Sequence, residues 1–275
     1  MKVIKKHKLI SKYLDKRIHW IQKAATNFLT LSVFKGQNPK VEFEETNDGT
    51  RSAVICKLTV DSMTYKYRIK TNHNGGESNQ ASLDLIELYC YKLLESIGVG
   101  PKIVFIPNCD SSKSIIYIGS EWLPKFNSFY SIEQVNTTEV SHAIVQIHFL
   151  AVFLSFGDMH EENFGLNESS DPIIVDFMMS DYGVPKTKFL HENNIILLIQ
   201  VRDILNDFDS TARRQIAKDA IEKWNLMNKL IKVRELINKE KANFGRINLD
   251  FDKKTKDLEE FVVKVKSNIE DLFHD

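Results

Sequence analysis

The chain has 275 residues, and its 37 Lys and Arg residues balance 37 Asp and Glu residues, so the formal net charge is zero. Hydrophobic residues make up 43% and charged residues 27%. This composition is typical of a folded globular protein and excludes a wholly disordered chain, which is poor in hydrophobic residues and carries a high net charge. The charge balance gives no general reason to expect a nucleic-acid or membrane partner.

The first 25 residues have a very uneven charge, because many Lys and Arg residues accompany Asp15 as the single acidic residue. Apolar residues recur there at helical spacing, as at Ile10, Leu14, Ile18 and Ile21. We therefore predict a basic N-terminal helical extension over residues 1–38. A basic amphipathic helix can bind an acidic partner or an acidic membrane surface, and the alternative is a helix that packs on its own domain.

Five segments after this extension have the composition of strands, and the first of them alternates apolar and acidic residues. The predicted strands are 39–46, 52–60, 64–71, 102–107 and 114–122. A helix is predicted over 83–98, and the chain after Pro124 has mainly helical patterns, with long ones over 211–243 and 254–273. This order predicts an α+β protein with a five-stranded antiparallel sheet domain at 39–123 and a helical domain at 124–275.

The three cysteines, Cys56, Cys90 and Cys109, are far apart and form no C-x-x-C pair. This spacing suggests neither a disulfide framework nor a cysteine zinc site, so we expect a cytoplasmic location. The longest apolar runs, 149–156 and 195–201, are far below the roughly 20 residues of a membrane-spanning helix. We therefore expect no transmembrane segment, and the N-terminus has no apolar core of a secretory signal.

The segment most informative about chemistry is FGDMHEENFGLNESSDPIIVDFM, residues 156–178. Asp158 and Asn163 lie in a predicted loop after an apolar helix, and Asp176 ends a short apolar strand. Carboxylate and amide oxygens are ligands that Mg²⁺ accepts, and Mg²⁺ usually completes its shell with water and substrate phosphates. A further carboxylate beside the metal can accept a proton from an attacking hydroxyl.

The pattern G-D-x-H-x-x-N, followed by a strand that ends in D-F, resembles the catalytic core of the protein-kinase-like superfamily. Its form is closest to the aminoglycoside and choline phosphotransferases and to the phosphoinositide kinases, and HipA-type kinases have a related loop. The resemblance implies a two-lobed kinase-like fold that uses ATP and Mg²⁺. It implies that Asp158 is the catalytic carboxylate and that Asn163 and Asp176 hold the metal. His160 would support the loop or share in proton transfer.

Phosphoryl transfer in kinases also uses a strand lysine on the nucleotide phosphates, held by a helix glutamate. The stretch R-I-K in the third predicted strand resembles the kinase motif A-x-K, which makes Lys70 the candidate. Glu87 lies on or beside the apolar stripe of the following helix, and a buried carboxylate there requires a cationic partner. We predict a Lys70–Glu87 pair, with Glu77 as the competing acid and a solvated Glu87 as the simpler alternative.

Two further nucleotide contacts follow from the resemblance. The turn 45–52 stands where kinases have a glycine-rich loop, and Gly49 and Thr50 could offer main-chain N–H groups to phosphate oxygens. An ordinary hairpin turn is the alternative. Glu121, Trp122 and Leu123 stand where kinases bind adenine through main-chain atoms between the lobes.

The chain also departs from conventional protein kinases, since Met178 replaces the glycine of D-F-G, Phe156 replaces a histidine and no A-P-E motif follows. We expect an atypical kinase that transfers the γ-phosphate to a hydroxyl of a small molecule, a lipid or an atypical protein substrate. Its partners are then a nucleotide and a hydroxyl-bearing acceptor, and no nucleic acid. The alternatives are a catalytically inactive kinase-like scaffold and an unrelated α+β protein with a chance motif.

Overall fold

The computed structural model describes residues 18–45, 53–71, 84–108, 115–132, 137–180, 183–193, 196, 199–240 and 251–274. Residues 1–17, Gly49, Thr50, Glu77 and Cys109 lie outside this part of the chain. The chain divides into two compact units. The first comprises Met1–Asp84, Lys102–Trp122 and Glu240–Lys254, and the second comprises Leu85–Pro101, Leu123–Lys239 and Thr255–Asp275.

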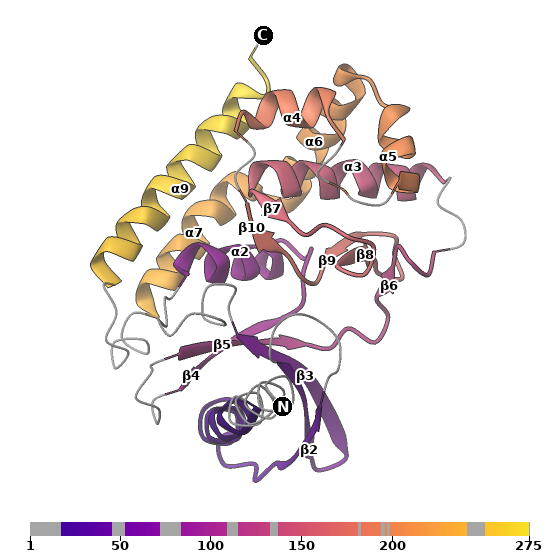
Figure 1. Cartoon of the computed structure of the whole chain (residues 1–275). Coiled ribbons are helices and arrows are strands. Elements are labelled where there is room, and N and C mark those ends of the chain that lie inside the picture. Colours follow the sequence, from indigo (N-terminus) through magenta and orange to yellow (C-terminus); the bar gives the residue numbers. More distant parts are fainter. Residues whose placement is uncertain are drawn as a thin grey trace, which may run out of the picture. The chain divides into compact units, whose positions relative to one another are not determined.

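The first unit contains a five-stranded sheet in the order β1-β2-β3-β5-β4, in which every neighbouring pair is antiparallel (Figure 1). Its strands are β1 Lys40–Glu45, β2 Ala53–Val60, β3 Met63–Thr71, β4 Ile103–Asn108 and β5 Ile115–Glu121. The observed strands agree with the predicted ones to within a residue or two at each end. The α+β class with a five-stranded antiparallel sheet is therefore confirmed.

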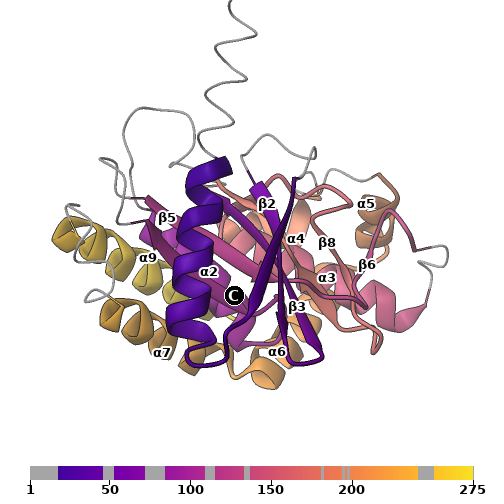
Figure 2. The same cartoon turned by 90° about the horizontal axis from the view of Figure 1, so that it is seen from below.

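A helix over residues 18–28, continued by a π-helical turn at Leu29–Val33, covers one face of this sheet (Figure 2, indigo). Its fully buried Ile21, Ala25 and Leu29 pack into one core cluster with sheet residues such as Leu58 and Ile69. Burying each large aliphatic side chain stabilises the fold by about 1.5–3 kcal/mol. The described part of the basic N-terminal segment thus packs on its own sheet.

The alternation of β3 places Tyr67 and Ile69 in that core and turns Lys66, Arg68 and Lys70 to the opposite face. Lys66 Nζ lies 3.8 Å from the centre of the Trp122 ring, a cation–π contact. Lys70 is only 3% exposed. The second face of the sheet therefore carries a buried ammonium group next to the end of β3.

The second unit is mainly helical (Figure 1). Its described helices are α2 Leu85–Ser96, α3 Thr138–Phe153, α4 Pro185–His191, α5 Ile199–Asn206, α6 Ser210–Trp224, α7 Leu226–Lys239 and, from Thr255 onward, α9 Phe251–Asp271. The almost wholly buried α3 packs against α4, α5 and α6, while α2 packs against α7. Because of these contacts α2 belongs to the same compact unit as the other helices. The predicted domains, a nucleotide-binding domain at 39–123 and a catalytic domain at 124–275, stay predictions.

The helical prediction for 211–243 was wrong in one respect, because two helices cover this stretch. Asn225 lies between α6 and α7 with φ 49° and ψ 41°, the left-handed conformation. Its N–H donates to the carbonyls of Ile221 and Glu222 and closes the last turn of α6. Asparagine adopts this conformation more readily than most residues, so α6 can end and α7 can begin there without a glycine or a proline.

Short strands lie within and beside the segment 156–178, and the sequence patterns indicated only the one that precedes Asp176. One group is β6 Asn127–Ser128, β8 Phe164–Leu166 and β9 Pro172–Ile174, and the other is β7 Phe156–Gly157 with β10 Met178–Met179. In β8, a Cβ added to Gly165 would lie 2.0 Å from the Asn127 carbonyl oxygen, so only glycine allows β6 to approach this closely. These pairs hold the two ends of the segment in place.

Within the described ranges, no helix combines the length and the hydropathy needed to cross a bilayer.

His148 lies in the middle of α3 and is completely buried. Among the described residues, neither of its ring nitrogens has a hydrogen-bond partner. Its ring lies 5.6 Å from that of Phe189, centre to centre. Burial, with the nearby Arg213 charge as a smaller cause, lowers the pKa of His148 to about 3. The imidazole is therefore neutral in the folded protein at all ordinary pH values.

This burial predicts an acid-labile core. Because the unfolded histidine has a pKa of about 6.5, the unfolded chain binds a proton below that pH and the folded chain does not, so stability present above pH 6.5 is lost as the pH falls. We expect the change His148→Met to reduce the loss of unfolding free energy between pH 7 and pH 5 by about 2 kcal/mol. Urea unfolding at both pH values measures it.

His142→Met is the matched control, since His142 lies on the same helix and is exposed. Equal pH dependence of the wild type and the His148→Met variant would contradict the assignment.

Candidate active site

Asp158 directly follows β7, the short strand after α3, and its main chain is left-handed. Its φ of 57° lies in the left-handed region, a conformation that costs a non-glycine residue about 1 kcal/mol or more. Its carbonyl oxygen accepts hydrogen bonds from His160 N at 3.0 Å and from Asn163 Nδ2 at 2.8 Å. The loop thus folds back on this carbonyl, and the Asp158 residue remains exposed.

Asn163 is buried and is hydrogen-bonded through both its side chain and its main chain. Its carbonyl oxygen accepts from Val175 N at 2.9 Å and from Asp176 N at 3.4 Å. Because Nδ2 donates to Asp158, Oδ1 is the side-chain atom that carries lone pairs for a cation. Asn163 therefore joins the loop that begins at Asp158 to the strand end at Asp176.

Asp176 follows β9 and is held by two donors on one oxygen. Its Oδ1 accepts from Phe177 N at 2.8 Å and from the Tyr91 hydroxyl at 2.9 Å. The pairing of β7 with β10 sets Gly157 opposite Met178. Asp158 directly follows Gly157 and Asp176 lies two residues before Met178, so this pair brings together the main chain beside the two residues. The structure thus brings Asp158, Asn163 and Asp176 together within the second unit.

A stack of aromatic rings lies behind these polar groups. The rings of Phe156 and Phe177 are stacked at 4.1 Å between centres, and the ring of Tyr91 lies 4.3 Å from that of Phe177. All three residues are buried. Phe156 lies two residues before Asp158 and Phe177 directly follows Asp176, so their packing supports the main chain beside the two acidic residues.

The departures from the kinase pattern have a simple structural account. Met178 replaces a glycine, but it lies in β10 with extended main chain, where no left-handed conformation is required. Phe156 replaces a histidine and contributes an apolar ring to the stack. His160 is partly exposed, and its Nδ1 accepts from Glu162 N at 3.4 Å. That bond and the His160 N–Asp158 bond fit a role in supporting the loop, while a share in proton transfer stays a prediction.

The donor set fits magnesium better than a transition metal. Among the described residues, no group of three or more His, Cys, Asp or Glu side chains is arranged to hold a metal ion. Asp176 and Asn163 offer one carboxylate and one amide oxygen. Mg²⁺ is commonly held by one or two carboxylates together with water and substrate phosphates, whereas zinc needs three or four nitrogen, sulfur or carboxylate ligands from the protein.

Lys70 and Glu87 lie in different units. Lys70 is opposite Ala53 and Ile118 in the register of the sheet and is 3% exposed. Glu87 lies in the first turn of α2 and is 0% exposed. A buried charge is stable only when a partner compensates it. Lys70 and Glu87 are both buried, as the predicted ion pair requires. The pairing itself stays a prediction.

The other residues predicted to contact the nucleotide are Glu121, Leu123, Gly49 and Thr50. Glu121 ends β5, where its N–H donates to the Lys102 carbonyl at 2.9 Å and its carboxylate lies 3.6 Å from Lys102 Nζ. Leu123 belongs to the second unit, and its carbonyl accepts from Phe126 N at 3.3 Å. Gly49 and Thr50 lie outside the described residues. The adenine and phosphate-loop contacts therefore stay predictions.

Sequence reasoning missed Tyr91, which contacts the site directly through Asp176. Tyr91 lies four residues after Glu87 in α2, so the two share a helix face. This spacing indicated that Tyr91 lies on the same face of α2 as the predicted site residue Glu87. A tyrosine at an apolar helix position, however, is usually a core residue. Only the tertiary structure shows which carboxylate its hydroxyl meets.

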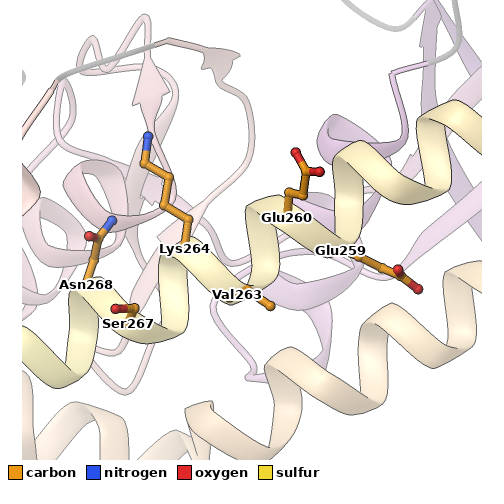
Figure 3. A pocket seen from close by; sticks show the side chains of 6 residues that line it. All are labelled: Glu259, Glu260, Val263, Lys264, Ser267 and Asn268. Atoms are coloured by element: carbon orange, nitrogen blue, oxygen red, sulfur yellow. The ribbon is translucent and has the colours of Figure 1, made fainter.

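A surface pocket on α9 is separate from these residues (Figure 3). It is lined by Glu259, Glu260, Val263, Lys264, Ser267 and Asn268, all from one helix. One helix face cannot surround a ligand, and the pocket contains neither the loop that begins at Asp158 nor Asp176. It is therefore not a candidate active site.

No family model matches the chain, and no curated protein matches it in sequence. One solved structure with a related arrangement is that of a putative aminoglycoside phosphotransferase from Ralstonia eutropha JMP134. It aligns with a TM-score of 0.42 and 10% identity over 90% of this chain and 98% of that one.

The role of Asn163 as a donor gives a stability prediction. Asn163→Asp replaces the Nδ2 donor by an oxygen, so the Asp158 carbonyl loses one of its two donors and faces a buried oxygen instead. We expect the free energy of unfolding to fall by about 1–3 kcal/mol, measured by urea unfolding at neutral pH.

Asn206→Asp is the control, because Asn206 is exposed and its Oδ1 accepts from Asn193 Nδ2 at 2.6 Å, a bond that an aspartate accepts equally well. If the two variants lose the same stability, the Asn163–Asp158 bond does not hold the loop.

Proposed function

We propose that the protein is an ATP- and Mg²⁺-dependent phosphotransferase, an atypical kinase that transfers the γ-phosphate to a hydroxyl of a small molecule, a lipid or an atypical protein substrate. The observation that carries the proposal is the hydrogen bonding of Asn163. Its side chain holds the Asp158 carbonyl, and its main-chain carbonyl holds the chain at Asp176. This arrangement supports one exposed carboxylate beside a carboxylate–amide pair that suits Mg²⁺.

The proposed roles follow from exposure and hydrogen bonding. When bound, Mg²⁺ supplies positive charge to the β- and γ-phosphate oxygens. Asp176 and Asn163 would hold the ion through oxygen atoms. Asp158, whose residue is exposed, would orient the acceptor hydroxyl and accept its proton. His160 would keep the loop in shape.

The reaction proposed for this site is a simple displacement. A bond forms between the acceptor oxygen and the γ-phosphorus, and the bond from that phosphorus to the oxygen bridging to the β-phosphate breaks. ADP leaves with the electron pair of the broken bond, and the acceptor proton passes to Asp158 and then to solvent. Such transfer depends mainly on positioning and on charge neutralisation, which the fixed loop suits.

Nucleotide binding is proposed for the remaining residues. Lys70 would contact the α- and β-phosphates and would be held by Glu87. Main-chain groups of Gly49 and Thr50 would cover the phosphates, and the chain from Glu121 to Leu123 would contact adenine. The burial of Lys70 and Glu87 supports the first of these assignments.

The central test removes each carboxylate separately. We expect Asp158→Asn to lower the rate of ATP turnover by about 10²–10⁴-fold, since a general base of this kind contributes that factor, while Mg²⁺–ATP still raises the melting temperature. Asp176→Asn should abolish both the turnover and the thermal shift. Asp171→Asn is the control, because Asp171 pairs with Lys223 at the surface of the same unit.

ADP release, with water or a panel of alcohols as the acceptor, measures the turnover. A wild-type protein that shows neither ADP release nor a thermal shift with Mg²⁺–ATP would contradict the proposal and favour the inactive scaffold.

A double-mutant cycle tests the Lys70–Glu87 pair. We expect Lys70→Met and Glu87→Gln each to raise the KM for ATP, and the double variant to lose less than the sum of the two. The interaction energy should lie in the range of about 0.5–3 kcal/mol that contacting residues show. Additive losses would show that the two residues do not interact.

A further inference from the structure

We propose that Tyr91 is a positioning residue for metal binding: its hydroxyl orients the Asp176 carboxylate, and the affinity of the site for Mg²⁺ depends on this hydrogen bond. The inference rests on the proposed function, because it assigns Asp176 to the metal.

The hydrogen bond itself is well placed for this role. The Tyr91 oxygen lies 2.9 Å from Asp176 Oδ1, and the same Oδ1 accepts from Phe177 N at 2.8 Å. Two donors on one oxygen define the rotation of the carboxylate about its last bond. Partners that orient a metal-binding carboxylate in this way typically change metal affinity or activity 10–100-fold when they are removed.

The position of the hydroxyl is set by packing. Tyr91 is 1% exposed in α2, and its ring lies 4.3 Å from that of the fully buried Phe177, which is stacked on Phe156. The ring therefore has little freedom to follow a moving carboxylate. The donor is fixed before any ion binds, and binding needs less reorganisation of Asp176.

The chemistry of the donor also suits a metal ligand. A phenol is neutral, so it orients the carboxylate and leaves the negative charge in place for the cation. A lysine or arginine at the same position would neutralise that charge and compete with the ion. The tyrosine hydroxyl thus orients the Asp176 carboxylate without neutralising its negative charge.

Tyr89 provides a matched control on the same helix. It is also fully buried, and its hydroxyl donates to the Leu230 carbonyl in α7 at 3.0 Å. Tyr91→Phe and Tyr89→Phe therefore each remove one buried tyrosine hydroxyl and one hydrogen bond from α2. Only the first removes a bond to Asp176.

The experiment titrates Mn²⁺ into the full-length protein with a non-hydrolysable ATP analogue and measures free Mn²⁺ by electron paramagnetic resonance. We expect Tyr91→Phe to weaken Mn²⁺ binding at least about 10-fold. Tyr89→Phe should stay within about twofold of the wild type, because its partner is a main-chain carbonyl outside the site. Asp176→Asn, measured alongside, reports the full loss of the ligand, and melting temperatures show that all variants are folded.

The outcomes separate the two proposals. Unchanged Mn²⁺ affinity in Tyr91→Phe, with the affinity lost in Asp176→Asn, would overturn the role of Tyr91 and leave the proposed function intact. Equal weakening in the Tyr91 and Tyr89 variants would also overturn it, since the effect would then follow from general destabilisation. A wild-type protein that binds no Mn²⁺ with the nucleotide would overturn both.

Discussion

The hydrogen bonds of Asn163 are the constraint on which the rest of the site depends. Without the Nδ2 donor, the left-handed main chain at Asp158 would lose one of the two bonds that compensate its conformational cost. The bonds from Val175 N and Asp176 N to the Asn163 carbonyl tie the strand end at Asp176 to the same loop. One buried amide residue thus connects an exposed carboxylate, suited to proton transfer, with one suited to metal binding.

The packing behind this loop explains how polar groups can be held with little freedom. Phe156 and Phe177 adjoin the two carboxylate segments, and the pairing of β7 with β10 joins them through the main chain. Tyr91 extends the stack and adds a donor to Asp176. Apolar contacts therefore support the main chain of the site, and neutral hydrogen bonds orient the Asp176 carboxylate while preserving its negative charge.

Much of the fold could be predicted from the sequence because its signals are local. Alternation over β1 to β5 gave their limits closely, and the spacing of Asp158, Asn163 and Asp176 suggested a shared site. The break at Asn225, the short strands β6, β7, β8 and β10 and the contact between Tyr91 and Asp176 could not be predicted. The break depends on a left-handed residue that is not glycine, and the short strands pair over only two or three residues. The contact joins two residues that are 85 positions apart in the chain.

We propose that the loop at Asp158 and the strand end at Asp176 form a magnesium–nucleotide site. The most direct measurement follows the side-chain amide resonance of Asn163 by nitrogen-15 NMR as Mn²⁺ and ATP are added. A paramagnetic ion bound through Asn163 Oδ1 would broaden this resonance beyond detection at low Mn²⁺ occupancy, and the change Asp176→Asn would restore it. An Asn163 amide resonance that keeps its width in the wild type, while Mn²⁺–ATP is bound, would contradict the account.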